Sequence, residues 1–382
     1  MAEREPDLYS VHLSTARTWR GGENQIWLLA RGLQQRGQKA LVLAPPGAPL
    51  LERCAAAGVP ARGFSFCCEL DPSGIGRLCA LLRRERPDIL HLHDGHAVLP
   101  GQLAAYWSRQ PQLRVVAHRR TVFALKGRWK YGRGVDRIIA ISAAVRDMLL
   151  AAGISAVKIA VVYSGLEFAP AVPDSAGRNG TSGQAALALR QKLGLPDDAL
   201  LVGHAAALTA EKRQRDMVAA VARANEILKG AGSAGVHLLI AGSGDQEEAL
   251  RHEARRRGVE SQVHLLGFLQ DVSPLWAASA VALYASEAEG LCTGLIEAQG
   301  AGVPAVITRA GGMVEVVAAD ESGLVVAVGD VEGLAAALAK LARDPALRQR
   351  LGQAAARLAR RKFSSEAMVD GVLRVYRETA GC

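Results

Sequence analysis

Two glutamates lie on the stretch that joins one apolar segment to the next. In "SEAEGLCTGLIEAQGAGVPAV" (286–306), Glu289 and Glu297 have seven residues between them. The apolar segment "VALYA" (281–285) precedes them, and "VPAVIT" (303–308) runs through the end of the stretch. Removing a carboxylate from water costs free energy unless another group compensates the charge. Carboxylates beside two buried strands therefore need a partner that compensates their charge.

The segment between the glutamates also offers a place for an anion. A helix that begins near Gly294 would present the amides of Gly294 and Leu295 at its N-terminus, where free amides and the helix dipole favour negative charge. Glu297 would then lie in the first turn of this helix. Acidic residues are favoured in the first turn of any helix. A purely structural role for Glu297 is therefore the alternative.

Three other glycine-bearing segments follow expected strands. Gly21 and Gly22 in "RGGEN" open the first expected helix, where they would let an anion approach the backbone closely; a plain tight turn is the alternative. "GSGDQE" (242–247) resembles half of a dinucleotide fingerprint, but Glu247 occupies the place of the third glycine. The "GG" at 311–312 fits either a close approach or an ordinary loop.

Apolar strand patterns alternate with helical spacing through most of the chain. Residues 23–37 predict a helix with Ile26, Leu29, Ala30 and Leu33 on one face. The stretch 169–186 is rich in Gly, Pro, Ser and Ala and has no periodicity. The expected strands lie at 8–14, 39–44, 88–94, 113–118, 137–142, 159–165, 200–208, 236–242, 262–269, 281–285 and 303–308.

Two successive series of this kind predict an α/β protein with two doubly wound parallel sheets (Rossmann-like). We expect an N-terminal domain at 1–170, a linker at 171–188 and a C-terminal domain at 189–364. A C-terminal helix at about 365–382 is expected to pack back on the N-terminal domain. Ligands bind beyond the carboxyl ends of parallel strands, so two facing sheets would enclose a cleft.

The composition is that of a soluble globular protein, with 49% hydrophobic and 22% charged residues. No apolar stretch reaches the roughly 20 residues that a membrane-spanning helix needs. The charged start "MAEREPDLYS" lacks the apolar core of a secretion signal. The six cysteines form no CxxC pair, which favours a reducing compartment. A cytoplasmic protein is the expectation.

Positive charge is concentrated in the first part of the chain. Residues 1–180 hold 24 lysines and arginines against 14 acidic residues, whereas the remainder holds 22 against 23. The densest part, 119–137, has seven basic residues and one acid, interleaved with aromatic residues. This pattern predicts contact with an anionic membrane; a solvated basic loop is the alternative, and no motif supports nucleic acid. The residues expected at the acceptor or membrane are His93, His96, Arg119, Arg120, Lys126, Arg128, Trp129 and Lys130.

Histidines gather at the ends of the expected N-terminal strands. His91, His93 and His96 lie in "HLHDGH", and His118 ends the next strand. Three histidines beside an acid resemble a set of zinc ligands. Spacing alone does not exclude that alternative, but we expect no metal.

Taken together, these motifs resemble glycosyltransferase family 4, retaining enzymes of the GT-B fold that use nucleotide sugars. The resemblance covers nearly the whole chain, and it rests on the order and spacing of its motifs. These are "RGGEN", "AEKR" (210–213), "AGSGD", "LLGFLQD" (265–271), the two glutamates, "GAGVPAVIT" and the "GG" at 311–312.

The resemblance implies that residues 1–170 form the acceptor-side domain and that residues 189–364 form the domain that binds the nucleotide-sugar donor. It also implies a role for each motif. Glu297 would accept hydrogen bonds from both ribose hydroxyls, and Glu289 would lie beside the donor sugar. Lys212 would neutralise the diphosphate. The implied catalytic residues are Glu289 and His118, the latter against a sugar hydroxyl. The implied donor-binding residues are Gly21, Gly22, Lys212, Gly267, Phe268, Gly294, Leu295 and Glu297.

Two positions depart from the family pattern. Ala207 stands five residues before Lys212, where an arginine is common, so the diphosphate loses one expected cation. Either Arg213 or Arg215 would have to replace it, and an ordinary surface role for both is the alternative. Cys292 stands where glycine or proline is frequent, which leaves open which amides face the phosphate.

The implied activity is retaining, metal-independent glycosyl transfer without a cofactor. The donor would be a nucleotide-diphosphate sugar, and the acceptor an envelope glycan or glycolipid of the lipopolysaccharide or exopolysaccharide type. The enzyme would work at the inner face of the membrane. The alternatives are another GT-B nucleotide-sugar enzyme, such as an epimerase, and a non-catalytic binding module. A dinucleotide-dependent oxidoreductase would need an intact GxGxxG. Glycoside hydrolysis would need two carboxylates flanking one bond, which a ribose-bound Glu297 cannot provide.

Overall fold

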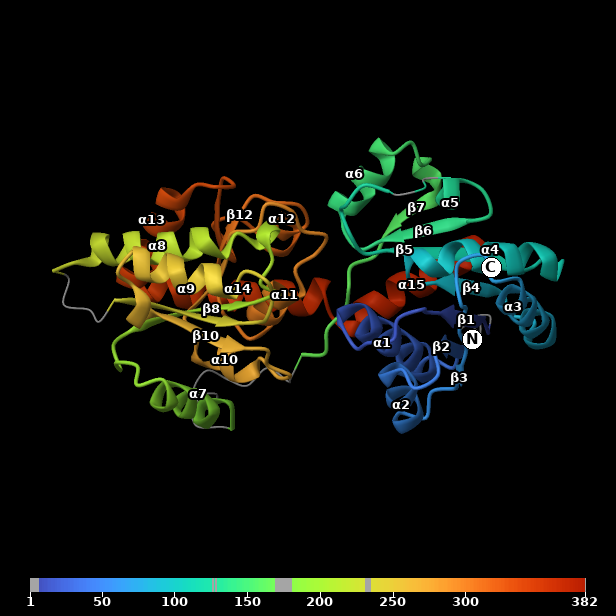
Figure 1. Cartoon of the computed structure of the whole chain (residues 1–382), viewed down its shortest axis with the longest axis horizontal. Helices are drawn as coiled ribbons and strands as arrows, with labels where there is room; N and C mark the ends of the chain where they lie inside the picture. Colours follow the sequence, from blue (N-terminus) through green and yellow to red (C-terminus); the bar gives the residue numbers. More distant parts are fainter. Residues whose placement is uncertain (1–6, 126, 128, 169–180, 231–234, 382) are drawn as a thin grey trace, which may run out of the picture. The chain divides into compact units, whose positions relative to one another are not determined.

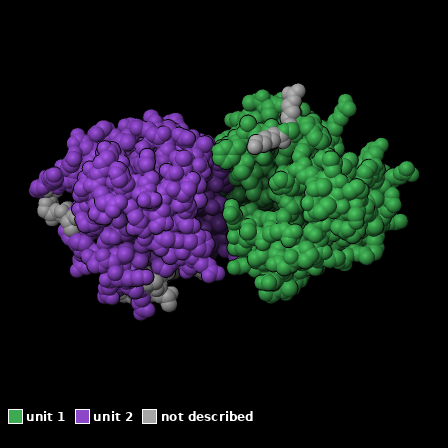
Figure 2. All heavy atoms as spheres, viewed as in Figure 1, with its two compact units in different colours: residues 1–165, 363–382 green, residues 166–362 purple. Residues whose placement is uncertain are grey.

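The computed structural model describes residues 7–125, 127, 129–168, 181–230 and 235–381. The chain divides into two compact units (Figure 2). Unit 1 comprises residues 1–165 and 363–382, and unit 2 comprises residues 166–362. In the described part of the chain, no helix combines the length and the apolar character that crossing a bilayer requires.

The described residues of unit 1 form a parallel sheet of seven strands in the order β3-β2-β1-β4-β5-β6-β7 (Figure 1). Each central strand is a short apolar run, as expected of strands that are covered on both faces. The strands are β1 (Tyr9–Leu13), β2 (Lys39–Ala44), β3 (Ala61–Gly63), β4 (Ile89–Leu92), β5 (Arg114–Arg119), β6 (Arg137–Ala140) and β7 (Ile159–Val161).

Helices cover this sheet, and the last helix of the chain is one of them. Its apolar face, with Met368, Val369 and Val372, lies in the same buried cluster as Ile26 and Leu29 of α1. The helices of unit 1 are α1 (Gly21–Gln35), α2 (Pro49–Ala56), α3 (Pro72–Glu85), α4 (Gly95–Ser108), α5 (Trp129–Gly132), α6 (Ala143–Ala151) and α15 (Ser365–Ala380).

Unit 2 contains a second parallel sheet, of six strands, in the order β10-β9-β8-β11-β12-β13. The strands are β8 (Leu200–Ala205), β9 (Val236–Ala241), β10 (Val263–Gly267), β11 (Val281–Tyr284), β12 (Ala305–Thr308) and β13 (Gly323–Val326). The helices are α7 (Thr181–Lys192), α8 (Gln214–Leu228), α9 (Glu247–Arg256), α10 (Ser273–Ala278), α11 (Thr293–Gly300), α12 (Met313–Val316), α13 (Val331–Arg343) and α14 (Pro345–Lys362).

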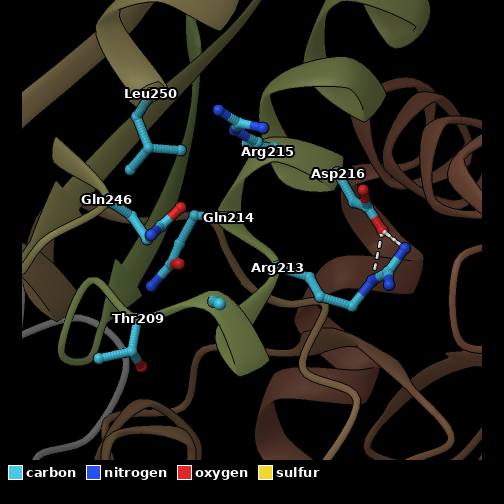
Figure 3. Close-up of a pocket in the computed structure, with 8 residues that line it drawn as sticks. Thr209, Arg213, Gln214, Arg215, Asp216, Gln246 and Leu250 are labelled. Atoms are coloured by element: carbon cyan, nitrogen blue, oxygen red, sulfur yellow. Dashed lines mark hydrogen bonds and ion pairs between the residues drawn. The ribbon is translucent and has the colours of Figure 1, made fainter. Parts of the chain in front are cut away.

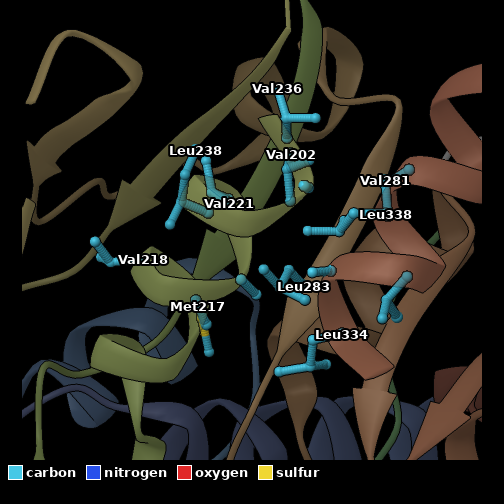
Figure 4. Close-up of a cluster of buried hydrophobic side chains, with 14 of the residues drawn as sticks. Val202, Met217, Val218, Val221, Val236, Leu238, Val281, Leu283, Leu334 and Leu338 are labelled. Carbon is cyan, nitrogen blue, oxygen red and sulfur yellow. The ribbon is translucent and has the colours of Figure 1, made fainter. Parts of the chain in front are cut away.

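The core of unit 2 lies where α8 and α13 pack together over the sheet (Figure 4). Val218 and Val221 come from α8, Leu338 from α13, and Val202 and Leu283 from the central strands. All five side chains are buried. Burying one such aliphatic side chain is worth about 1.5–3 kcal/mol, so this cluster holds the central strands and their loops in place.

Both sheets reverse their order at one point, which is between β1 and β4 in unit 1 and between β8 and β11 in unit 2. At such a point the following loops turn to opposite sides and leave a crevice beyond the carboxyl ends of the strands. The loops after these four strands are therefore where each unit is expected to bind a ligand.

The prediction of two doubly wound parallel sheets is confirmed, and each expected strand overlaps an observed one. Sequence analysis missed β3 and β13, the short edge strands with a neighbour on one side only. Of the predicted linker at 171–188, residues up to 180 lie outside the described part of the chain. Residues 181–188 are helical rather than irregular, because they begin α7, which packs against α10.

Candidate active site

Lys212 and Glu289 lie on the two loops that follow β8 and β11, at the crevice of unit 2. Lys212 ends a short 3₁₀ helix (Ala210–Lys212), and Glu289 precedes α11. The two loops are joined directly, since the amide of Glu287 donates to the carbonyl of Glu211 at 2.9 Å. Residues that are 77 positions apart in the chain thus become neighbours.

The two side chains form an ion pair. The Lys212 Nζ lies 2.5 Å from Glu289 Oε1, with exposed side-chain fractions of 17% and 8%. The Ser286 hydroxyl also donates to Glu289 Oε1, at 3.2 Å. Burial alone would lower the pKa of Lys212, but the Glu289 carboxylate outweighs it and raises that pKa. Lys212 is therefore a firmly charged cation that a diphosphate would have to share with Glu289.

Glu297 occupies a different position in its helix from the one that we predicted. Because α11 begins at Thr293, Glu297 is its fifth residue, and the first turn holds no acidic residue. The prediction that Glu297 lies in the first turn is wrong, and capping of the helix terminus does not explain it. Its carboxyl comes from the second turn instead.

Burial raises the pKa of Glu297 to about 7, and the negative charge of Asp271 adds to this shift. The indole N–H of Trp276 opposes the shift, although its nitrogen is outside hydrogen-bonding geometry to any described acceptor. A desolvated carboxyl of this kind is well suited to accept hydrogen bonds from neighbouring hydroxyl groups.

Two glycines allow the loops of this site to pack closely against neighbouring backbone. A Cβ on Gly294 would lie 2.5 Å from the carbonyl oxygen of Ala205 and 2.6 Å from the hydroxyl of Tyr284. Gly311 has φ +47°, and a Cβ there would lie 2.0 Å from the carbonyl oxygen of Glu289. The "GG" at 311–312 is therefore a close approach, but to the loop that carries Glu289.

Sequence analysis missed two buried polar groups that support the site. Tyr284 is fully buried at the end of β11 and donates to the carbonyl of Ala205 at 3.2 Å. Thr308, at the end of β12, donates to the carbonyl of Ser286 at 2.6 Å. Both stand inside apolar strand patterns, which carry no signal for such roles.

Ala207 leaves the expected diphosphate site without one arginine, and Arg213 and Arg215 are the two candidates to replace it. Arg213 has φ +50° and is paired with Asp216 at 2.7 Å and with Glu287 at 3.3 Å. It lines a pocket beside the start of α8, where Figure 3 shows its bonds to Asp216. Arg213 is thus already neutralised. Arg215 lines the same pocket, is exposed and has no ion pair with a described residue.

The remaining donor-site predictions lie at several strand ends. Gly267 ends β10 with φ +70°, and its carbonyl accepts from the amide of Gly242 at 2.8 Å. Phe268 follows it and is 75% exposed. Burial raises the pKa of the Cys292 thiol, which caps α11 without a side-chain hydrogen bond.

In unit 1, four buried histidines gather at the carboxyl ends of β1, β4 and β5. These are His12, His91, His93 and His118. Burial lowers the pKa of each, to about 3 for His12, so all four are neutral at physiological pH. The rings of His91 and His118 are stacked with centroids 5.3 Å apart. His12, on a strand that otherwise reads as apolar, was not predicted.

A hydrogen-bond chain determines the proton positions on two of these rings. The guanidinium of Arg120 can only donate, so His93 Nδ1, which lies 3.2 Å from it, must accept. The proton of neutral His93 is then on Nε2, which donates to His12 Nδ1 at 3.0 Å. His12 in turn donates from Nε2 to Ser10 Oγ at 2.9 Å.

These hydrogen bonds argue against the zinc alternative. Among the described residues, His12, His91 and His93 bring ligand nitrogens within 4.8 Å of one another. A metal between them would need a lone pair on His93 Nε2, which carries the proton while Arg120 holds Nδ1. His96 lies apart from the cluster, because it is exposed and pairs with Glu69 at 3.1 Å. The arrangement therefore fits a hydrogen-bond network better than a metal site.

Gly21 and Gly22 form the first residues of α1, in front of this cluster. The carboxylate of Glu23 caps the helix by accepting from the amide of Arg20 at 2.8 Å. A Cβ on Gly21 would meet open space, and one on Gly22 would lie 3.9 Å from Cδ of Arg120. Among the described residues, packing does not require either glycine, and Arg120 is the side chain that approaches the Cβ position of Gly22.

The basic stretch 119–137 is only partly available for a membrane. Lys126 and Arg128 lie outside the described residues. Arg119 donates to the carbonyl of Phe123 at 2.6 Å, and Lys130 forms an ion pair with Glu69. Trp129 and Phe123 are 61% and 60% exposed. Lys130 is therefore not the free cation that the sequence suggested, whereas the two aromatic rings are accessible.

Two family models match the chain. "Glycosyl transferases group 1" matches residues 187–358, and "Glycosyltransferase Family 4" matches residues 19–169. The chain belongs to glycosyltransferase family 4. The resemblance drawn from the motifs is confirmed.

Individual relatives agree with this family. The lipopolysaccharide core biosynthesis glycosyltransferase LpsE of Rhizobium meliloti is 32% identical over 49% of this chain and 52% of its own. The putative glycosyltransferase EpsD of Bacillus subtilis is 28% identical over 49% of this chain and 48% of its own. The chain thus spans about half the length of these curated relatives.

A solved structure supports the GT-B fold. Anabaena HepE, in complex with UDP, has a TM-score of 0.81 and 20% identity, with 97% of this chain and 100% of HepE covered. The same protein was also solved with UDP-glucose.

Proposed function

We propose that this chain is a retaining glycosyltransferase that takes a sugar from a nucleoside-diphosphate sugar. The observation that carries the proposal is the group formed by Lys212, Glu289 and Glu297 beyond the strands of unit 2. One firm cation, one paired carboxylate and one desolvated carboxyl match a ligand that has a diphosphate and several hydroxyls. HepE, which binds UDP and UDP-glucose, supports the choice of donor.

In the proposed reaction, Lys212 stabilises the negative charge that develops on the leaving diphosphate. The α11 N-terminus, with the amides of Gly294 and Leu295, adds to this stabilisation. Glu297 accepts from the ribose hydroxyls, and Glu289 lies beside the sugar. The bond between the anomeric carbon and the diphosphate breaks, and a bond to the acceptor oxygen forms on the same face. The leaving phosphate oxygen takes the acceptor proton, and no metal takes part.

We propose an envelope glycan or glycolipid as the acceptor. The relation to LpsE, which is named for lipopolysaccharide core biosynthesis, supports this class. We also propose that the enzyme contacts the inner face of an anionic membrane through the basic stretch 119–137. The exposed rings of Phe123 and Trp129 support that contact, because aromatic rings favour the headgroup layer.

The test is incubation with UDP-, GDP- and ADP-sugars, followed by measurement of released nucleotide and of the sugar product. Release or transfer that is lost in Glu289→Gln supports the proposal. A new free sugar isomer would identify an epimerase, and tight binding without turnover would identify a binding module. Arg36→Gln is a control, because Arg36 belongs to unit 1 and pairs there with Asp370.

A further inference from the structure

Arg120 lies against the loop that follows β4 in unit 1, and it forms no ion pair with any described residue. Its Nη1 donates to the carbonyl of His93 at 2.6 Å, and its Nη2 donates to His93 Nδ1 at 3.2 Å. The Nε atom is buried and has no hydrogen-bond partner among the described residues. Burial lowers the pKa of Arg120 to about 10, so the side chain is desolvated but still charged at neutral pH.

The two acidic residues nearest to Arg120 are occupied elsewhere. Glu23 and Asp94 raise its pKa through their charge, but neither forms an ion pair with it. Glu23 caps α1. Asp94 accepts from the amide and the hydroxyl of Thr15, at 2.7 Å each, and from two amides at the start of α4. A partly buried cation that has no ion pair with a described residue is costly, which indicates a site for an anionic ligand.

The guanidinium is held in one orientation by the histidine chain. His93 can accept from Arg120 only while its proton is on Nε2 and is donated to His12. His12 then donates to Ser10, whose hydroxyl donates to the carbonyl of Lys39 at 3.3 Å. Each proton that His93, His12 and Ser10 donate in this series of hydrogen bonds points away from Arg120. Because the histidines are neutral, they orient the cation without cancelling its charge.

The start of α1 adds to the positive potential at this place. The Gly22 Cβ position lies 3.9 Å from Cδ of Arg120, so the side chain runs past the N-terminus of a 15-residue helix. Helix N-termini carry a partial positive charge and free amides. The buried Nε of Arg120 is an independent donor at the same place.

We propose that Arg120 binds an oxyanion of the substrate, either a phosphate or a carboxylate group, and that His93 is the positioning residue that aims it. The inference rests on the proposed function, since it assigns this oxyanion to the acceptor or to the donor diphosphate. Both sources present the same chemistry to a guanidinium, and the experiment separates them.

The experiment measures binding in the full-length protein without turnover. Inorganic phosphate, glucuronate and UDP are titrated separately, and the Arg120 Nε–H resonance is followed by NMR. We expect phosphate to shift this resonance. We expect Arg120→Gln to weaken phosphate binding about tenfold or more, the scale of a hydrogen bond to a charged group, whereas Arg120→Lys retains part of the affinity. The control Arg36→Gln, at an arginine of unit 1 that is paired with Asp370, should bind as the wild type does.

A pair of His93 variants tests the positioning role. In His93→Asn the side-chain oxygen can occupy the place of Nδ1 and still accept from Arg120. In His93→Gln the longer side chain places its amide near Nε2 instead, so Arg120 loses its side-chain acceptor and keeps only the backbone carbonyl of residue 93. We expect phosphate affinity to survive in the first variant and to fall in the second. The ¹⁵N shifts of His93 in the wild type should show an unprotonated Nδ1.

The outcomes are distinguishable. Loss of phosphate or glucuronate binding in Arg120→Gln with unchanged UDP affinity assigns the oxyanion to the acceptor, and loss of UDP affinity as well assigns it to the donor. Wild-type protein that binds none of the three probes, or unchanged affinities in a folded Arg120→Gln, overturns the inference. If Arg120→Gln does not fold, the Nε–H shift and Arg120→Lys still decide. Absence of glycosyl transfer alongside Arg120-dependent phosphate binding would refute only the proposed function.

Discussion

The carboxyl of Glu297 provides a test that separates a ligand role from a structural one. Its pKa is about 7 in the folded protein against an ordinary value of 4.5. Because the folded state binds this proton more tightly, the ionised carboxylate destabilises the fold, and the free energy of unfolding falls as pH rises from about 4.5 to 7. This penalty amounts to about 1 kcal/mol at pH 5 and about 3 kcal/mol at pH 8.5.

Replacing Glu297 by Gln removes the charge and keeps the shape. We expect Glu297→Gln to raise the free energy of unfolding of unit 2 by about 3 kcal/mol at pH 8.5 and by about 1 kcal/mol at pH 5. Donor binding should weaken by roughly 1.5–3 kcal/mol, since hydrogen bonds from ribose to a charged group are lost. Urea unfolding at both pH values and calorimetric titration with UDP measure the two effects.

The opposite pair of results would refute this reasoning. If Glu297 only served its helix, Glu297→Gln would lower the stability and leave the affinity of the folded protein for UDP unchanged. Glu315→Gln is a matched control, because it makes the same change at a glutamate of unit 2 that lies on another helix, α12. It should show neither the pH-dependent gain nor the loss of affinity.

Three further predictions concern catalysis and location. Glu289→Gln should lower turnover more than donor affinity, and an equal loss of both in steady-state kinetics would contradict its place beside the sugar. Chelator should leave activity unchanged; stoichiometric zinc whose removal abolishes activity would refute metal independence. The protein should sediment with anionic vesicles at low salt and be released as salt rises, because exposed charges are screened over about 10 Å at 0.1 M. The variant for this test replaces four basic residues of the stretch by Ser at once, namely Lys126, Arg128, Lys130 and Arg133. If this variant still sediments with the vesicles, the basic stretch is only a solvated surface.

Much of the architecture followed from periodicity. Apolar runs predicted the central strands, because a parallel strand that is covered on both faces must be apolar along its length. The edge strands β3 and β13 escaped detection, although the other two edge strands, β7 and β10, were predicted. β3 has three residues and no buried side chain, so it has no apolar run to detect. The start of α7 escaped for a related reason, because its segment is rich in small residues and its packing partner, α10, is about 90 residues away in the chain.

The candidate site was predicted in its membership but not in its contacts. Lys212, Glu289 and Glu297 were identified from motif order, yet the pairing of Lys212 with Glu289 was not. Tyr284 and His12 were overlooked, because a polar residue inside an apolar strand has the same sequence pattern whether or not it supports a site.

The sequence by itself determined the alternation of strands and helices, the family, and which residues can take part in chemistry. These features depend on local order and spacing. Only the tertiary structure decided which of those residues meet. The order of the strands brings the loop after β8 against the loop after β11, and it places His12 beside His93. Burial then sets the charge states, with neutral histidines, a raised pKa at Glu297 and a charged Arg120 that has no ion pair with a described residue. Desolvation depends on everything that surrounds a group in space, and no stretch of sequence contains that information.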